Sequence, residues 1–309
     1  MKNRLATLQR HPRSTLSPVR ESPTENVYVL EGPKEFERLE RQAQTDEYHF
    51  HEEFLALTRA IQVQFSNHGA TRPLRILDAG TGSGFAARAL GHQFKDSEVL
   101  GWDQSEDRVS KTQSQTPAEL KNRVLFQTRN LLEASAPLEE QKFDVIFSRF
   151  VFQHMPRAKQ EKLLGNLRCH LKDQGLICLV DIDGILGNLH PLPAQLSRTL
   201  AILQNRLPMD FHAGRGLHTH LLSLNPSQMR TLVYPMIFHG ESLRAESERA
   251  RCRLESSLSH LEEALGSNSK ARDFIYDYIN ALQSPHAFLY YSKIVSIAKF
   301  EPKIQQSKE

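Results

Sequence analysis

Three glycines alternate directly behind a short apolar run that ends in an acidic residue. The run covers residues 75–78, and Gly80, Gly82 and Gly84 follow it, ahead of a helical pattern over residues 85–90. A strand, a tight glycine turn and a helix N-terminus in this order form the place where open α/β sheets bind nucleotide-like ligands. Glycine allows backbone conformations that a Cβ atom forbids, and a ligand can lie against its bare backbone. The turn therefore predicts an α/β fold with a ligand at this edge of the sheet.

The residues around this turn separate three classes of ligand. A P-loop needs Gly-Lys-Ser/Thr at its end, whereas Phe85 and Ala86 follow Gly84. A dinucleotide-binding turn has its third glycine where Phe85 stands, so that match is out of register. The carboxylate of Asp78 would repel a pyrophosphate but suits a ligand that carries an ammonium and a sulfonium group. S-adenosylmethionine is such a ligand.

Two stretches carry a resemblance to the class I S-adenosylmethionine-dependent methyltransferases. Residues 76–84 resemble the first motif of that family, which is an apolar strand, Asp or Glu, and Gly-x-Gly-x-Gly. Residues 143–146 are similar to the family's Phe-Asp-Val-Ile signature. The glycine pattern taken alone also suits a tight strand–helix turn that binds nothing. The resemblance spans residues 28 to about 299 and is weakest over residues 184–230.

The resemblance implies the α/β fold of the small-molecule methyltransferases: a seven-stranded, Rossmann-like, doubly wound sheet with N-terminal helices and a helical lid insertion. The alternation of apolar runs with helical patterns supports a parallel sheet with helices on both faces. We expect a disordered tail at residues 1–26, an N-terminal helical cap at 27–70, a methyltransferase domain at 71–299 with its lid at about 184–230, and a second tail at 300–309.

The resemblance also implies a set of cofactor contacts. Asp103 follows the second expected strand, where a carboxylate can bind both ribose hydroxyls, although it also suits the N-cap of a helix that begins near Ser105. The family usually has Asp at the position of Asn130, whose side-chain amide can still contact adenine. The implied contacts are Tyr28, Arg38, Asp78, Gly80, Thr81, Gly82, Gly84, Asp103, Gln104, Asn130, Leu131 and Ser148.

Several of these contacts depend on position alone. Tyr28 and Arg38 lie in a segment that, in the family, folds over the cofactor, and Arg38 could pair there with the methionine carboxylate. A solvated Arg38 and a packing Tyr28 explain the same pattern equally well. Gln104 flanks the ribose carboxylate, and the backbone of Leu131 could read the adenine edge. Ser148 would emerge at the end of the fourth strand, against the transferred methyl group.

The catalytic candidates are few, because methyl transfer from a sulfonium mainly requires an aligned nucleophile and the exclusion of water. Arg149 and His154 follow the fourth expected strand, and we expect both at the substrate. His154 suits a general base, but it also suits a packing residue. Asp181 and Asp183 could hold a substrate amine or a water molecule, or cap the next segment.

Composition limits the partners and the compartment. The net charge of +3 is small and the charges are mixed, so nucleic acid is an unexpected partner. No apolar run is long enough for a membrane span. The three cysteines are widely spaced and form neither a metal pair nor a disulfide framework, which predicts no metal and a cytoplasmic protein. We expect a small organic acceptor between the aromatic walls of Phe211, Tyr234 and Phe238.

We therefore interpret the chain as an S-adenosylmethionine-dependent methyltransferase that acts on a small organic acceptor. The choice between O-, N- and C-methylation and the oligomeric state stay open. The alternative is a non-catalytic S-adenosylmethionine-binding scaffold or regulatory protein with the same fold, because a fold does not prove turnover. A nicotinamide oxidoreductase is disfavoured by Asp78 and Phe85.

Overall fold

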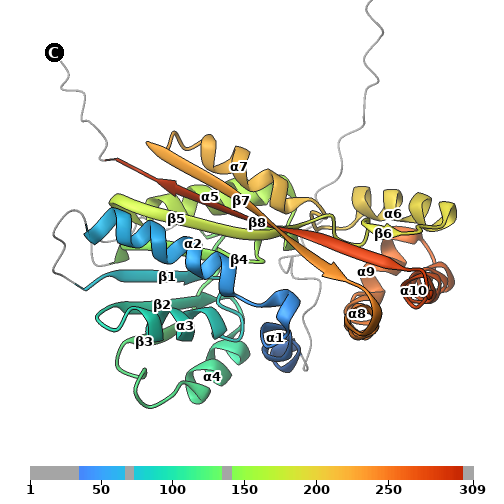
Figure 1. The fold of residues 1–309 in the computed structure, drawn as a ribbon, viewed down its shortest axis with the longest axis horizontal. Helices are drawn as coiled ribbons and strands as arrows, with labels where there is room; N and C mark the ends of the chain where they lie inside the picture. Colours follow the sequence, from blue (N-terminus) through green and yellow to red (C-terminus); the bar gives the residue numbers. More distant parts are fainter. Residues whose placement is uncertain (1–34, 67–72, 134–140, 302–309) are drawn as a thin grey trace, which may run out of the picture.

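The computed structural model describes residues 35–66, 73–133 and 141–301. Within them, eight strands form one mixed sheet, in which the hydrogen-bonded order is β3-β2-β1-β4-β5-β8-β6 (Figure 1). Strands β5 and β6 pair with successive parts of one edge of β8, and β7 pairs with its opposite edge. The strands are β1 (Arg75–Ala79), β2 (Glu98–Asp103), β3 (Val124–Thr128), β4 (Phe143–Arg149), β5 (Leu171–Asp183), β6 (Leu189–His190), β7 (Gln228–Phe238) and β8 (Phe288–Lys299).

Ten α-helices and three short helical turns lie in the described residues. The α-helices are α1 (Glu35–Ala43), α2 (His51–Ile61), α3 (Phe85–Gln93), α4 (Glu106–Gln115), α5 (Arg157–Cys169), α6 (Ala194–Arg206), α7 (Ala213–Leu222), α8 (Gly240–Ser256), α9 (Leu258–Leu265) and α10 (Asn268–Leu282). The turns are η1 (Asp46–Tyr48), η2 (Gln62–Ser66) and η4 (Phe152–His154).

The parallel part of the sheet reverses its strand order at β1. This strand pairs with β2 on one side and with β4 on the other, and both pairs are parallel. Both β1 and β4 are buried along nearly their whole length, as expected for parallel strands that are covered on both faces. Ligands of open α/β sheets bind at the carboxyl ends of the strands beside such a reversal. The fold therefore directs a ligand to the residues that follow β1, β2 and β4.

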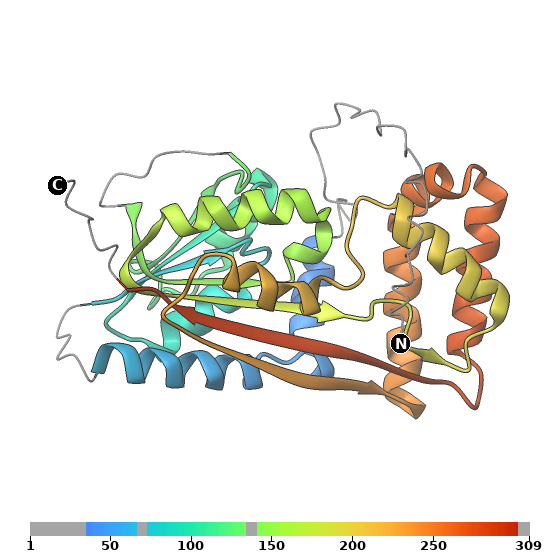
Figure 2. The ribbon, with the colours of Figure 1, turned by 90° about the horizontal axis from the view of Figure 1, so that it is seen from above.

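Helices cover both faces of the sheet (Figures 1 and 2). On one face, α2 and α3 pack against Val145 and Phe147 of β4. On the other face, α5 and α7 pack against Ile146 of the same strand. Successive side chains of a strand point to opposite faces, so neighbouring residues of β4 serve different layers.

A second group of helices, α6, α8, α9 and α10, lies at one end of the sheet, and we call it the helical lobe (Figure 2). The ends of β7 and β8 extend into it, where Phe238 and Leu289 are buried in one core with Leu203, Leu254 and Tyr278. In the sequence, α8, α9 and α10 lie between β7 and β8. These two paired strands therefore join the sheet to the helical lobe.

The α/β sheet predicted from the sequence is confirmed, with one strand more than the expected seven. The additional strand, β6, consists of Leu189 and His190 and pairs with the extension of β8. So short a segment shows no alternation of apolar and polar residues from which a strand could be predicted. Of the lid expected over residues 184–230, α6 joins the helical lobe, whereas α7 packs on the sheet through Leu217 and Leu221.

Parts of the expected domain organisation lie outside the described residues: the tail at 1–26, the cap residues 27–34 and 67–70, and residues 302–309. The domain boundaries stay a prediction. None of the helices in the described ranges has the length and apolar character to cross a membrane. Over the same ranges, no group of three or more His, Cys, Asp and Glu side chains is placed to hold a metal ion.

Candidate cofactor and acceptor cavity

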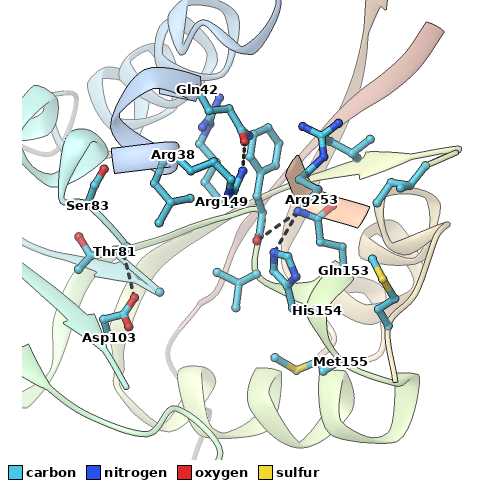
Figure 3. A pocket seen from close by; sticks show the side chains of 18 of the residues that line it. Arg38, Gln42, Thr81, Ser83, Asp103, Arg149, Gln153, His154, Met155 and Arg253 are labelled. Carbon is cyan, nitrogen blue, oxygen red and sulfur yellow. Dashed lines mark hydrogen bonds between the residues drawn. The ribbon is translucent and has the colours of Figure 1, made fainter. Parts of the chain in front are cut away.

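A cavity of about 290 Å³ joins the glycine turn to the helical lobe (Figure 3). Its turn end is lined by the residues that follow β1, β2 and β3 and by α1. Its other end, which we call the apolar arm, is lined by side chains of the lobe and of the segments that lead to it. The apolar arm consists of Ile182, Ile185, Leu186, Leu207, Met209, Phe211, Ala250, Leu254 and Leu261.

The glycine turn has a left-handed backbone that connects two acids. Gly80 and Gly82 have φ angles of 79° and 56°, a region in which other residues are strained. The hydroxyl group of Thr81 donates to Oδ2 of Asp78 at 2.6 Å, and the N–H group of Gly82 donates to Oδ2 of Asp103 at 2.9 Å. The turn therefore fixes both carboxylates at the turn end of the cavity.

Asp78 is a carboxylate in surroundings with little water. It lines the cavity, but only 2% of its surface is exposed. Burial raises the pKa of Asp78 to about 6, although hydrogen bonds from Thr81 and from the backbone of Ala87 oppose this rise. A buried negative charge is costly unless a cation compensates it. The site therefore suits a ligand that places an ammonium or sulfonium group nearby.

Asp103 is already engaged by donors of the protein. Its Oδ1 accepts from the N–H group of Ser105 at 3.0 Å and from Nη2 of Arg108 at 2.8 Å. Arg108 is buried and also lines the cavity. The N-cap of α4 is Ser105, so the alternative role of Asp103 as a helix cap is wrong. A ribose hydroxyl bound to Asp103 would share the carboxylate with a guanidinium group.

The loop after β3 forms the wall next to Asp103. Asn130, Leu131 and Gln104 line the cavity there. Oδ1 of Asn130 accepts from the N–H group of Leu132 at 3.0 Å, and Nδ2 of Asn130 donates to Oε1 of Glu133 at 3.2 Å. Asn130 thus closes a local turn with its side chain, as asparagine often does. This turn presents Asn130 and Leu131 on the same wall.

Helix α1 covers the glycine turn. A Cβ atom added at Gly82 would lie 3.3 Å from Cδ1 of Leu39, which shows how closely the helix approaches. Arg38 lines the cavity, and it donates from Nη2 to Oε1 of Glu35 at 2.6 Å and from Nη1 to Oε1 of Gln42 at 2.5 Å. A ligand carboxylate at Arg38 would therefore meet an ion pair and not an isolated cation.

Arg149, the last residue of β4, is held on the cavity wall. Its Nε donates to Oε1 of the buried Glu53 at 2.8 Å, and its Nη2 donates to the carbonyl group of Tyr48 at 2.5 Å. The guanidinium carbon lies 4.0 Å from the centre of the Phe150 ring. Phe150 has a φ angle of 58°, which costs a residue with a side chain about 1–3 kcal/mol. Charge and ring packing thus fix this part of the wall.

His154 lies next to Gln153 in the same wall, with 3.4 Å between Nε2 of the ring and Nε2 of the amide (Figure 3). Burial in the surrounding protein, together with the positive charges of Arg38 and Arg108, lowers the pKa of His154 to about 3. A base so weak is poorly matched to proton transfer near neutral pH. The structure therefore favours a packing role over a general base.

The loops that line the turn end of the cavity lie in a stretch of the chain that matches a known family model. Residues 76–175 match the family model described as a methyltransferase domain. They contribute β1, β2, β3 and β4, with the glycine turn and the loops that line the turn end of the cavity. This stretch of the chain is therefore identified as a methyltransferase domain.

Two known methyltransferases illustrate the likeness. Methyltransferase str3 from Strobilurus tenacellus is 36% identical to this chain over 88 residues, which cover 28% of this chain and 28% of that protein. Structures of Haemonchus contortus phosphoethanolamine N-methyltransferase 2 have a TM-score of 0.52 and 16% identity, over 86% of this chain and 57% of that chain. The chain therefore matches less than a third of the curated relative's length, and the structural likeness concerns the fold.

Most of the contacts predicted for the methyltransferase domain meet in the cavity. Those that line it are Arg38, Asp78, Gly80, Thr81, Gly82, Asp103, Gln104, Asn130 and Leu131, together with Arg149 and His154. Tyr28 lies outside the described residues.

Two predicted contacts do not line the cavity. The hydroxyl group of Ser148 donates to the carbonyl group of Ala79 at 2.9 Å inside the sheet. Side chains alternate along a strand, so only its neighbour Arg149 points to the cavity. Gly84 begins α3, and a Cβ atom there would lie 2.2 Å from Cγ2 of Thr112. The role of Gly84 is therefore the close packing of two helices.

The two acids at the carboxyl end of β5 also have partners within the chain. Oδ2 of Asp181 accepts from the N–H group of Gln153 at 3.1 Å. Asp183 pairs with Arg215 of α7, whose Nε lies 2.7 Å from Oδ1 of the acid. Neither acid lines the cavity. The expectation that they hold a substrate amine or water is therefore wrong.

The walls of the acceptor side are mostly aliphatic. Of the three aromatic side chains expected there, only Phe211 lines the cavity. Phe238 is buried in the core of the helical lobe, and Tyr234 packs against the core on one face of the sheet. Side chains such as Ile185 and Leu254 take their place.

Sequence reasoning missed two cationic side chains of the cavity, Arg108 and Arg253. Each lies on a helix rich in charged residues, and such a pattern indicates a solvated helix face. Arg108 is buried because Asp103 pairs with it, and Arg253 is enclosed because Glu246 pairs with it. Each acid lies close in the sequence, five residues before Arg108 and seven residues before Arg253, but this spacing does not show that the pair is enclosed at a cavity.

Proposed function

We propose that this chain transfers the methyl group of S-adenosylmethionine to a small organic acceptor. The observation that carries the proposal is a single cavity that connects Asp78 and Asp103, on the glycine turn, to the apolar arm. A cofactor at the turn end would meet an acceptor in the arm inside the protein. Exclusion of water from such a meeting point is a main requirement of methyl transfer.

The turn end fits S-adenosylmethionine in charge and in shape. The buried Asp78 would hold the ammonium group, Asp103 the ribose hydroxyls, and Asn130 and Leu131 the adenine edge. Arg38 would receive the methionine carboxylate. The structures of phosphoethanolamine N-methyltransferase 2 contain S-adenosylmethionine or S-adenosylhomocysteine in the same fold, which supports this choice.

S-adenosylmethionine supplies a methyl group that its sulfonium already activates, so the carbon–sulfur bond breaks as the bond to the acceptor forms. The contribution of the protein is alignment and a dry site. Arg149 and Phe150 give the wall at the end of β4 a fixed shape, and the apolar arm removes water from the acceptor. Because His154 is a weak base, an acceptor atom whose lone pair is free at neutral pH is favoured.

Isothermal titration calorimetry of the full chain with S-adenosylmethionine and S-adenosylhomocysteine tests the proposal. We expect micromolar binding of both ligands to the wild type and at least about hundredfold weaker binding to Gly82→Val. A folded wild-type protein that binds neither ligand would contradict the proposal. Binding of NADH instead would indicate an oxidoreductase.

A non-catalytic S-adenosylmethionine-binding scaffold is the second candidate. It is supported by the ion pair between Arg108 and Asp103 and by the off-pattern Asn130. A scaffold would bind S-adenosylmethionine but would release no S-adenosylhomocysteine when mixed with pools of small acids, phenols and amines. Release with any one pool decides for the enzyme.

We further propose a small molecule as the main partner and the cytoplasm as the compartment. Cys169, Cys178 and Cys252 carry free thiols, which suits a reducing compartment. The small net charge of +3 favours a small-molecule acceptor over nucleic acid. Fractionation of cells that express the tagged full chain tests the compartment.

A further inference from the structure

Arg253 brings a positive charge to the edge of the apolar arm. It lies on α8 between the arm residues Ala250 and Leu254, and it lines the cavity (Figure 3). One-fifth of its side-chain surface is open, at 20%. A guanidinium group next to aliphatic walls is costly unless a partner compensates its charge.

The partner of Arg253 inside the protein is shared with other donors. Glu246 is fully buried, and it accepts from Nε of Arg249 at 2.7 Å, from Oη of Tyr48 at 3.0 Å and from Nη2 of Arg253. Arg249 also lies 3.9 Å from Glu47. Among the residues that the structure describes, Glu246 is the one ion-pair partner of Arg253. Glu246 does not line the cavity, so the charge that faces the cavity at this point is that of Arg253.

Arg253 keeps hydrogen-bond donors for a ligand. Nη2 is used by Glu246, and no acceptor in the described part of the chain is bound by Nε or Nη1. Burial opposes the charged form of Arg253, but the attraction of Glu246 raises its pKa above the ordinary value, so the group stays charged. The planar guanidinium fork matches a carboxylate in geometry.

The apolar arm carries a positive charge and no negative one. The acids that line the cavity, Asp78 and Asp103, lie at its turn end, and Arg38, Arg108, Arg129 and Arg149 line the cavity outside the arm. The apolar arm offers no acid in its described lining, and its cation is Arg253. An anion is therefore favoured at the arm.

We infer that the acceptor is an apolar carboxylic acid, with its carboxylate against Arg253 and its hydrocarbon body in the apolar arm. Transfer of a methyl group to this acid depends on the proposed function, whereas its binding does not. The aliphatic walls formed by residues such as Ile185, Leu186 and Leu261 fit a hydrocarbon body, since they offer no hydrogen bonds.

Displacement of a neutral fluorescent probe, N-phenyl-1-naphthylamine, tests the inference without the cofactor. Straight-chain carboxylic acids of about six to twelve carbons are compared with the primary alcohols of the same length. We expect the probe to bind the full chain, and the best acid to displace it at least tenfold more effectively than its alcohol, because charge-assisted hydrogen bonds favour the acid. A folded protein that does not bind the probe, or alcohols that match the acids, would overturn the inference.

Three variants locate the effect. Arg253→Met should remove the preference for acids, and Arg253→Lys should keep most of it because the charge remains. Arg249 and Tyr48 still bind Glu246 in both variants, so we expect them to fold. Arg251→Met is the matched control, since Arg251 lies on the same helix and pairs with Glu248 away from the cavity lining. An unchanged preference in Arg253→Met would overturn the inference.

Calorimetry with S-adenosylmethionine, run on the same variants, separates this inference from the proposed function. We expect Arg253→Met to bind the cofactor with wild-type affinity. Acid preference without cofactor binding would contradict the proposed function alone. Cofactor binding without acid preference would contradict the inference alone.

Discussion

The two ends of the cavity differ in how the chain builds them. The turn end comes mostly from loops that directly follow β1, β2 and β3, with α1 over them. Its acids are held by backbone N–H groups and by near neighbours in the sequence. The apolar arm comes from segments far apart in the sequence, including α8, α9 and the residues after β5. Local chemistry therefore determines the cofactor end, whereas tertiary packing determines the acceptor end.

The difference teaches that a methyltransferase domain can be recognised before its acceptor. We propose that Asp78 and Asp103 contact the same ligand, and their spacing along the chain made both residues predictable. The arm is an arrangement of aliphatic side chains such as Leu254, and those residues would equally suit a closed hydrophobic core. Four experiments test whether the two ends are as independent as this comparison suggests.

Asp103→Ala should have the largest effect, because Asp103 serves the fold as well as the ligand. The change removes the carboxylate that pairs with the buried Arg108, and loss of one member of a buried pair costs about 3–5 kcal/mol of unfolding free energy. Affinity for S-adenosylmethionine should fall by about 2–4 kcal/mol. Urea denaturation and calorimetry measure the two effects.

A double variant separates the two roles of Asp103. Asp103→Ala combined with Arg108→Met should regain most of the unfolding free energy, because both members of the buried ion pair are then removed. The double variant should not regain affinity for the cofactor. Recovery of both would show that Asp103 acts on the cofactor only through stability.

Gly82→Val should have the next largest effect, confined to the turn end. The φ angle of 56° strains a β-branched residue by about 1–3 kcal/mol, and the new side chain fills the cofactor site. Affinity for S-adenosylmethionine should fall at least about a hundredfold, measured by calorimetry. Gly165→Ala in α5 is the control, because a Cβ atom there meets nothing within 4 Å. Retained binding in Gly82→Val would mean that the cofactor does not lie on this turn.

Ala250→Leu should affect only the apolar arm. Ala250 is 1% exposed and lines the cavity, so a larger side chain occupies space that we assign to the acceptor. We expect the acceptor KM to rise about tenfold, which corresponds to about 1.4 kcal/mol of binding free energy. Affinity for S-adenosylmethionine should change less than about twofold. Equal losses at both ends would break the comparison between them.

The smallest effect is expected from pH, through Asp78. The pKa of Asp78, about 6, lies above the ordinary value of 3.8, so the folded protein favours the protonated form of this carboxyl group. Asp78 therefore makes the unliganded protein less stable as the pH rises from about 4 through 6. A bound cation favours the carboxylate, so cofactor affinity should rise about tenfold from pH 5 to pH 7. Calorimetry at each pH measures this rise. Asp78→Asn should bind more weakly, with no such pH dependence.

Sequence was sufficient for elements whose pattern is local. The strand before the glycine turn and the two acids follow from residue type and order. The error at Ser148 arose at the end of a strand, where one position decides which way a side chain points. Arg108 and Arg253 were not predicted, because the spacing of a nearby acid does not reveal that the pair is enclosed at a cavity.

The position of the helical lobe in the chain has a consequence for how acceptor choice could change. Helices α8, α9 and α10 are inserted between two strands, β7 and β8, that pair over eleven residues from Gln228 to Phe238. The insertion therefore leaves and re-enters the sheet at one fixed place. Substitutions in the lobe can reshape the arm while the pairing of β7 with β8 preserves the sheet and the cofactor end. Such a layout lets a lineage exchange one acceptor for another without having to rebuild its methyl-donor site.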